Sequence, residues 1–159
     1  MKKNENFQLD DLDKKILNEL IQSKNLTYSK LSQKLYVSLG TIHQRIKKME
    51  AAHIIQGIQV KLNYQSLGYS VISFLGIYLE KSSLYDKVAS ELTKIPEVVR
   101  LNYTTGYYSI FAELVCKDIQ SLKDVLHDKV QKISGISRTE TFVSLDQTLS
   151  RSITLELTE

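Results

Sequence analysis

The sequence contains a single cysteine, Cys116, so no disulfide can form within the chain. No second cysteine lies near a histidine, and the spacing typical of a metal site is therefore missing as well. Apolar runs long enough to cross a membrane are lacking, and the opening segment MKKNENFQLDD has no apolar core of the kind that a secretion signal needs. We therefore expect a protein of the reducing cytoplasm, with no metal, no cofactor and no membrane partner.

The charge of the chain is unevenly distributed. The 159 residues are 42% hydrophobic and 25% charged, which suits one ordinary domain or two small ones. Residues 1–61 hold eleven Lys and Arg against six Asp and Glu, whereas residues 62–159 hold ten against twelve. The N-terminal part, with a net charge of +5, is therefore the part expected to meet a polyanion.

Three amphipathic helices are predicted in the N-terminal third of the chain. Asp10 or Asp11 can cap the first helix, Thr27 the second and Ser38 the third. The positions that face inward at helical spacing are Leu12, Ile16, Leu17 and Leu20, then Leu31 and Leu35, then Ile42, Ile46 and Met49. The segment HIIQGIQVKL follows and predicts a small β-hairpin. Three helices and a hairpin describe a winged helix-turn-helix.

The polar face of the third helix is the candidate DNA interface, because the second helix of a helix-turn-helix fits the major groove. Gln44 can bond a base edge in two places, Arg45 can bond guanine or a phosphate, and Lys47 and Lys48 suit phosphates. Free N–H groups near Ser38 can also hold a phosphate. The alternative is an ordinary solvated face. The full predicted set is Ser38, Leu39, Gly40, Thr41, Gln44, Arg45, Lys47 and Lys48.

The rest of the chain predicts a small α+β domain. A polar connector is followed by the strand SVISFLGIYLE and by a helix that stops at Pro96. Next come the strands EVVRLNYTT and SIFAELVC, a second helix closed by Gly135, and the last strands ISRTETFVSL and SITLEL. The order β-α-β-β-α-β is ferredoxin-like. Cys116 ends an apolar strand and is interpreted as packing.

The strand VISFLGIYL is apolar on both of its alternating faces. Two helices can cover only one face of such a sheet, so the other would remain a large exposed apolar patch. A second copy of the chain is the simplest cover. We therefore expect a two-fold dimer built through the C-terminal domain.

The segment LDDLDKKILNEL and the stretch YSKLSQKLYVSLGTIHQRIKKMEAAHIIQG resemble the N-terminal domain of the Lrp/AsnC (feast/famine) transcription regulators. The similarity covers the whole recognition helix, SLGTIHQRIKKME, and continues through nearly all of the C-terminal half. It implies a DNA-binding domain at 1–61, a linker at 62–69 and a ligand-sensing and oligomerisation domain at 70–159. It further implies double-stranded DNA as partner, an amino-acid effector, and assembly of dimers up to an octamer. His53 stands where the family commonly has Gly.

The resemblance places the effector at a loop and an opposite wall. These are Thr104, Thr105, Gly106, Tyr107, Tyr108 and Ser109, and then Gly135, Ile136, Ser137 and Thr139. The family commonly shows Gly-Asp-Tyr-Asp in this loop, so Tyr107 and Ser109 replace both acidic positions. Three outcomes stay open: an unusual ligand, an amino acid held in another way, or no effector.

Three other functions are alternatives to that of an effector-modulated regulator. The first is an effector-independent architectural DNA-binding protein of the same fold. The second is a ferredoxin-like module that binds small molecules or RNA, although the RNA-recognition pattern is not evident. The third is an enzyme, for which no nucleophile–base pair, phosphate loop or metal cluster is found in the sequence. We therefore expect a sequence-specific transcriptional regulator rather than an enzyme.

Overall fold

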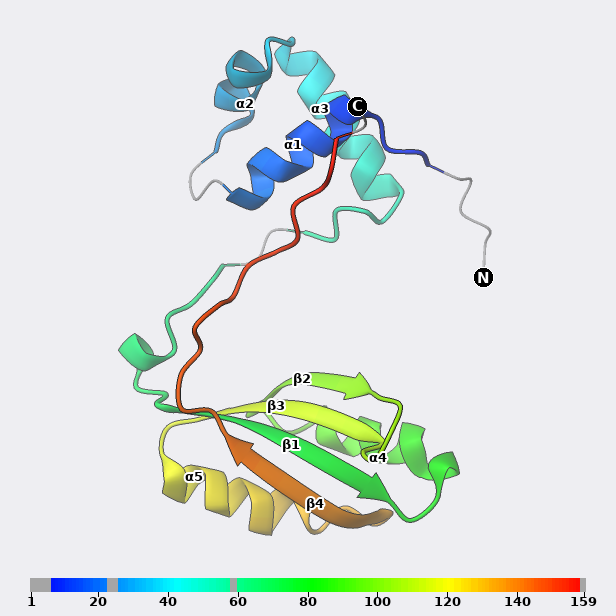
Figure 1. The fold of residues 1–159 in the computed structure, drawn as a ribbon, viewed down its shortest axis with the longest axis vertical. Coiled ribbons are helices and arrows are strands. Elements are labelled where there is room, and N and C mark those ends of the chain that lie inside the picture. Colours follow the sequence, from blue (N-terminus) through cyan, green and yellow to red (C-terminus); the bar gives the residue numbers. More distant parts are fainter. Residues whose placement is uncertain (1–6, 23–25, 58–59, 158–159) are drawn as a thin grey trace. The chain divides into compact units, whose positions relative to one another are not determined.

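The computed structural model describes residues 7–22, 26–57 and 60–157 (Figure 1). The chain divides into two compact units, of which the first comprises residues 1–60 and 149–159 and the second residues 61–148. The chain therefore passes from one unit to the other twice. The mixed α+β class predicted from the sequence is confirmed.

The described residues of the first unit contain three helices, whose starts are set by side-chain caps. Asp10 accepts a bond from the N–H of Asp13 (2.8 Å), Thr27 from that of Lys30 (3.3 Å) and Ser38 from that of Thr41 (3.0 Å), which confirms the predicted caps. The helices are α1 (Asp11–Gln22), α2 (Tyr28–Leu35) and α3 (Leu39–Ala51). Their common core consists of Ile16, Leu17, Leu31, Ile42, Ile46 and Met49.

The segment that follows α3 differs from the predicted β-hairpin. His53 has a φ of 57° and ends the helix, as expected for a residue that tolerates the left-handed region. The N–H groups of Ile54 and Ile55 both donate to the carbonyl of Met49, so they are used to close the helix. Residues 54–57 and 60–63 form no strand, while residues 58 and 59 lie outside the described part. The predicted hairpin is therefore not present in the described residues of this segment.

The second unit is a four-stranded antiparallel sheet with the strand order β2-β3-β1-β4. Its elements are β1 (Val71–Leu79), α4 (Tyr85–Leu92), β2 (Val98–Tyr103), β3 (Ile110–Cys116), α5 (Ile119–Asp124), its π-helical continuation η3 (Val125–Val130), and β4 (Ile136–Val143). Two short 3-10 turns, η1 (Gln65–Leu67) and η2 (Ser82–Leu84), precede β1 and α4. The sequence of elements is β-α-β-β-α-β, as predicted. Gly135 (φ 105°) lies five residues beyond the end of η3 and leads into β4, so it does not close the helix directly.

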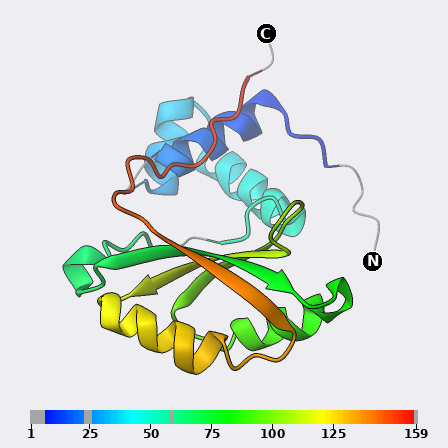
Figure 2. The ribbon, with the colours of Figure 1, turned by 60° about the horizontal axis from the view of Figure 1, so that its bottom comes forward.

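The helices α4 and α5 lie on the same side of this sheet (Figure 1; Figure 2). The residues between them and the sheet form the core of the unit, which includes Leu75, Ile77, Leu92 and Leu114. Cys116 is buried in this core, as expected for a packing residue, and burial raises the pKa of its thiol. The opposite face of the sheet carries aromatic side chains.

The prediction that SITLEL forms a strand is wrong. Residues 149–157 are irregular and group with the first unit, although the sequence had placed them in the C-terminal domain. The side-chain amide of Asn18 on α1 donates to the carbonyl of Leu155 (2.9 Å) and accepts from its N–H (2.8 Å). An amide side chain thus takes the place of a neighbouring strand, and the Leu155 side chain packs against the core of the three helices.

Candidate nucleic-acid interface

Helix α3 separates its residues cleanly into two faces. Ile42, Ile46 and Met49 are buried in the core of the first unit. Gln44, Lys47 and Lys48 are exposed. Within the part of the chain that the structure describes, neither lysine pairs with a carboxylate. Two cations and one amide are therefore exposed to solvent on a helix whose other face is buried.

The start of α3 adds backbone donors to this surface. The Ser38 hydroxyl accepts the N–H of Thr41 and lies 2.8 Å from the Thr41 hydroxyl, so Thr41 is engaged within the cap. The N–H groups of Leu39 and Gly40 belong to the first turn, which has no acceptors within the helix. Together with the positive end of the helix dipole, these N–H groups favour an anion at this point.

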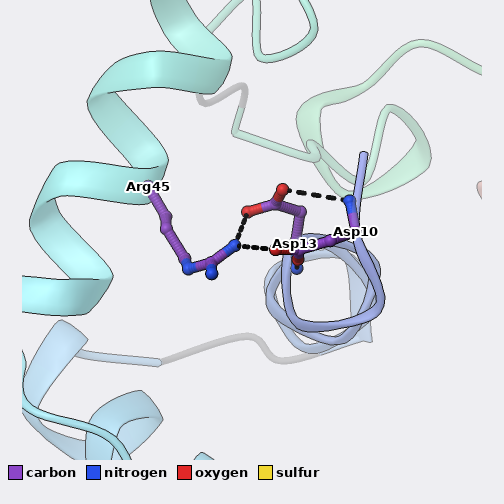
Figure 3. Close-up of polar contacts among 3 residues, drawn as sticks. All are labelled: Asp10, Asp13 and Arg45. Carbon is purple, nitrogen blue, oxygen red and sulfur yellow. Dashed lines mark hydrogen bonds and ion pairs between the residues drawn. The ribbon is translucent and has the colours of Figure 1, made fainter. Parts of the chain in front are cut away.

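The side chain of Arg45 does not extend toward a DNA base or phosphate, although the sequence had predicted this. Its Nη1 donates to Asp10 Oδ2 (2.6 Å) and to Asp13 Oδ1 (2.7 Å), as Figure 3 shows. The hydrogen bond from Arg45 holds the pKa of Asp10 below its usual value, and both carboxylates raise that of Arg45. Arg45 therefore joins α3 to the start of α1 and is not presented to a base edge. Sequence reasoning missed this contact. The segment LDDLD holds more acidic residues than a helix cap requires, and this surplus was the available signal for a basic partner.

A shallow depression of about 540 Å³ lies beside the exposed face of α3. The ring of Tyr28, the first residue of α2, stands edge-on to the ring of His43 at 4.8 Å between centroids. The residues that line the depression are Tyr28, Gly40, His43, Gln44, Ile46, Lys47 and Glu50. Tyr28 at the start of α2 and residues of α3 from Gly40 to Glu50 thus form one concave surface, which Gln44 helps to line.

The predicted effector loop, between β2 and β3, is held by hydrogen bonds between its own residues. The N–H of Thr104 donates to the carbonyl of Ser109 (3.1 Å), and the Thr104 hydroxyl donates to the carbonyl of Tyr108 (2.7 Å). Gly106 has a φ of 99° and permits the turn, with Thr105 and Tyr107 exposed beside it.

The predicted opposite wall of the effector site lies across the sheet from this loop. Ser109 donates to the carbonyl of Ile77 on β1, whereas Thr139 pairs with Ile77 from the other side. Gly135 and Ile136 pack against the helix side of the sheet, and Ser137 donates to the carbonyl of Tyr78 (3.1 Å). Strand β1 therefore separates the loop from the wall within one chain.

Tyr108 alone reaches across β1. Its hydroxyl donates to Glu140 on β4 (2.7 Å), and the hydroxyl of Tyr78 donates to the same carboxylate (3.3 Å). Arg138 forms an ion pair with Glu140 and lies over the ring of Tyr78 at 5.2 Å. The bonds from Tyr108 and Tyr78 and the charge of Arg138 lower the pKa of Glu140. The sequence analysis did not identify Tyr78, Arg138 or Glu140 as members of one cluster.

The described residues offer neither a metal-binding cluster nor a membrane-spanning helix. No group of three or more His, Cys, Asp or Glu residues in the described ranges is arranged to hold a metal ion. None of the helices there is both long enough and apolar enough to cross a bilayer.

Comparison with known proteins identifies relatives of both units. A family described as winged helix-turn-helix DNA-binding matches residues 9–56, and the Lrp/AsnC ligand binding domain matches residues 72–153. The regulatory protein AsnC of Escherichia coli (strain K12) is 39% identical over 149 residues, which cover 94% of this chain and 98% of the relative. The corresponding protein of Haemophilus influenzae is 40% identical over 145 residues, covering 91% and 97%.

Solved structures agree with these relatives. The structure of E. coli AsnC has a TM-score of 0.88 and 37% identity, covering 94% of this chain and 100% of that one. A transcriptional regulator of Neisseria meningitidis, solved as a complex with L-Met, has a TM-score of 0.86 at 21% identity, covering 94% and 97%. The similarity to the Neisseria meningitidis regulator, at this low identity, shows a shared fold.

Proposed function

This chain belongs to the Lrp/AsnC family of transcription regulators, and we propose that it binds duplex DNA through the exposed face of α3. The observation that carries the proposal is the division of that helix. Its apolar face is fully buried, whereas Gln44, Lys47 and Lys48 extend into solvent beside a first turn with free N–H groups. The proposed function includes no catalysis, and its setting is the cytoplasm.

Each part of this surface suits a different part of the duplex. Gln44 lines the concave surface, and its amide can form two hydrogen bonds with the edge of adenine in the major groove. Lys47 and Lys48 carry unshared positive charges for phosphates, and the N–H groups of Leu39 and Gly40 suit one further phosphate. Arg45 is left out of the proposed base contacts because two carboxylates hold it.

The DNA-binding proposal is tested by fluorescence anisotropy with labelled duplex at several salt concentrations. Each phosphate contact contributes about −0.9 to the slope of log K against log salt. The double variant Lys47→Ala/Lys48→Ala should therefore bind more weakly, with a slope that is shallower by about 1.8. Lys123→Ala, an exposed lysine on α5 in the other unit, is the matched control and should change neither quantity. An unchanged slope in the double variant, or no binding by the parent protein, would contradict the proposal.

The aromatic face of the sheet supports a two-fold dimer as part of the proposed function. The ring of Phe111 contacts those of Phe74 and Tyr108, and Phe142 beside Tyr108 remains 48% exposed. Burying such a surface against a second copy removes it from water. Two recognition helices would then meet successive major-groove turns about 34 Å apart, so the operator would be an imperfect palindrome. Dimers would assemble further, up to a tetramer of dimers.

The dimer is tested by light scattering on a charge-bearing variant. Phe142→Glu should yield the mass of a monomer, because a carboxylate buried in the interface would lose its hydration. Ile119→Glu is the control, since Ile119 is an exposed apolar residue on α5, on the helix side of the sheet. A dimer mass for Phe142→Glu would exclude this face as the interface.

We include an amino-acid effector in the proposed function. The solved Neisseria meningitidis relative was obtained with L-Met, and the loop from Thr104 to Ser109 offers a glycine turn with exposed neighbours. Because Tyr107 and Ser109 supply no carboxylate, the ammonium group of an amino acid would need another partner. Titration calorimetry with each of the twenty amino acids tests this. Absence of heat with all of them would favour the effector-independent architectural alternative.

A further inference from the structure

We propose that Arg45 is a positioning residue that sets the rotation of the recognition helix, rather than a residue that contacts DNA. This inference rests on the proposed DNA-binding function and goes beyond it. Arg45 follows Gln44 directly in sequence, so whatever fixes Arg45 also fixes the direction in which the neighbouring amide points.

Arg45, Asp10 and Asp13 form a contact between α3 and α1, which we call the clamp. Both hydrogen bonds leave the same atom, Arg45 Nη1, and end on the carboxylates of Asp10, which caps α1, and Asp13, in its first turn (Figure 3). The Arg45 side chain is 28% exposed, whereas that of Asp13 is 5% exposed and that of Asp10 is 54% exposed. The clamp therefore has one buried anchor and one at the surface.

The two carboxylates are themselves held in place. The N–H of Asp13 donates to Asp10 Oδ1 (2.8 Å), and the N–H of Asp10 donates to Asp13 Oδ2 (3.2 Å). This reciprocal pair caps α1 and leaves Asp10 Oδ2 and Asp13 Oδ1, the other oxygen of each group, for Arg45. The guanidinium thus binds acceptors that were already fixed by the backbone of another helix.

Apolar packing alone would fix the helix less well. Ile42, Ile46 and Met49 give α3 its affinity for the core, but burial of apolar surface is non-directional and tolerates small rotations. Charged hydrogen bonds are directional, and a side chain that reads a base edge must be held within about 0.5 Å and 10–20°. The clamp therefore supplies the orientation that Gln44 requires.

A direct DNA contact and a positioning role predict opposite results on the α1 side. If Arg45 contacted DNA, Asp13→Asn or Asp10→Asn would remove a competing negative charge and strengthen binding. If Arg45 positions the helix, the same changes loosen α3 and reduce discrimination between sequences. Asp10→Asn changes only the exposed carboxylate and leaves the buried Asp13 intact. It therefore still tests the inference if Asp13→Asn fails to fold.

The experiment compares two duplexes with the full-length protein. One duplex is selected by the parent protein from a random-sequence pool, and the other is a random duplex of equal length. Arg45→Lys, Asp13→Asn and Asp10→Asn should each lower the affinity ratio, by about tenfold where the clamp is lost completely. Arg45→Lys combined with Asp13→Asn should do no further damage, and the slope of log K against log salt should stay unchanged in every variant.

Glu19→Gln is the matched control. Glu19 forms a 2.6 Å ion pair with Lys34, which joins α1 to α2 rather than α1 to α3. Its loss should leave the affinity ratio intact. Circular dichroism verifies that each variant is folded before it is titrated.

Two results would overturn the inference alone. One is a salt slope about 0.9 shallower in Arg45→Ala, which removes the positive charge that Arg45→Lys keeps, because that change would mean a lost phosphate contact. The other is full discrimination by Asp10→Asn and Asp13→Asn. Failure of the parent protein to bind any duplex would instead refute the DNA-binding proposal, and this inference with it.

Discussion

The ring of Tyr108 rests on the backbone of Gly76. A Cβ atom at position 76 would lie 2.5 Å from the Cδ1 and Cε1 atoms of that ring. The ring lies across β1 in this way because its hydroxyl reaches Glu140 on the far side of the strand. An absent side chain on β1 thus permits a hydrogen bond between the β2–β3 loop and β4.

Gly76→Ala should therefore displace Tyr108 and destabilise the sheet. Forcing a methyl group into a filled space costs about 1–3 kcal/mol, and the bond to Glu140 is lost as well. Urea unfolding followed by circular dichroism measures the effect. Gly40→Ala is the control, because its Cβ would meet only Ser38 Oγ at 3.7 Å, and it should be neutral or stabilising by up to about 1 kcal/mol. Equal stability of Gly76→Ala and the parent would contradict this account.

Tyr108 should ionise later than an ordinary tyrosine. Its hydrogen bond to Glu140 and its burial raise its pKa to about 12. The bond stabilises the fold at pH values below about 10, the usual tyrosine pKa, and this contribution is lost as the pH rises toward 12. Absorbance titration of tyrosinate should show a late step that disappears in Tyr108→Phe. In Glu140→Gln the step should move toward the usual value, and a late step that survived in Tyr108→Phe would belong to another residue.

Asn18→Ala should weaken the helical unit by about 1–2 kcal/mol. The change removes both hydrogen bonds to the backbone of Leu155 and leaves that N–H and carbonyl without their partner. Unfolding of α1, α2 and α3 can be followed by far-ultraviolet circular dichroism. Ile153→Ala alters a side chain that is 77% exposed in the same segment, so it should have almost no effect. A neutral Asn18→Ala would mean that the docked segment adds nothing to stability.

Ser38→Ala should cost about 1 kcal/mol, because the N–H of Thr41 loses its acceptor at the start of α3. Ser38→Asn retains a capping side chain and should keep most of the stability. Denaturant midpoints of the two variants make the comparison, and equal losses would show that the cap is not the reason for serine at this position.

Sequence reasoning succeeded where the signals are local. The caps Thr27 and Ser38 act on N–H groups three residues away, and the helices and the four strands follow from spacing within each segment. It failed where the partner is remote. Arg45 meets Asp10 across 35 positions and Asn18 meets Leu155 across 137, and the spacing of residues within one segment does not pair such distant positions. The segment SITLEL alternates like a strand, but an amide on α1 provides its hydrogen bonds instead.

The docking of Leu155 has a consequence for synthesis of the protein. A ribosome makes α1, α2 and α3 first, and domains generally fold as they emerge. Here the core of those helices gains Leu155 only after every strand of the sheet has been translated. A nascent chain therefore cannot complete the core of its first unit early, and a polypeptide released before this point would carry α3 on a core that lacks Leu155.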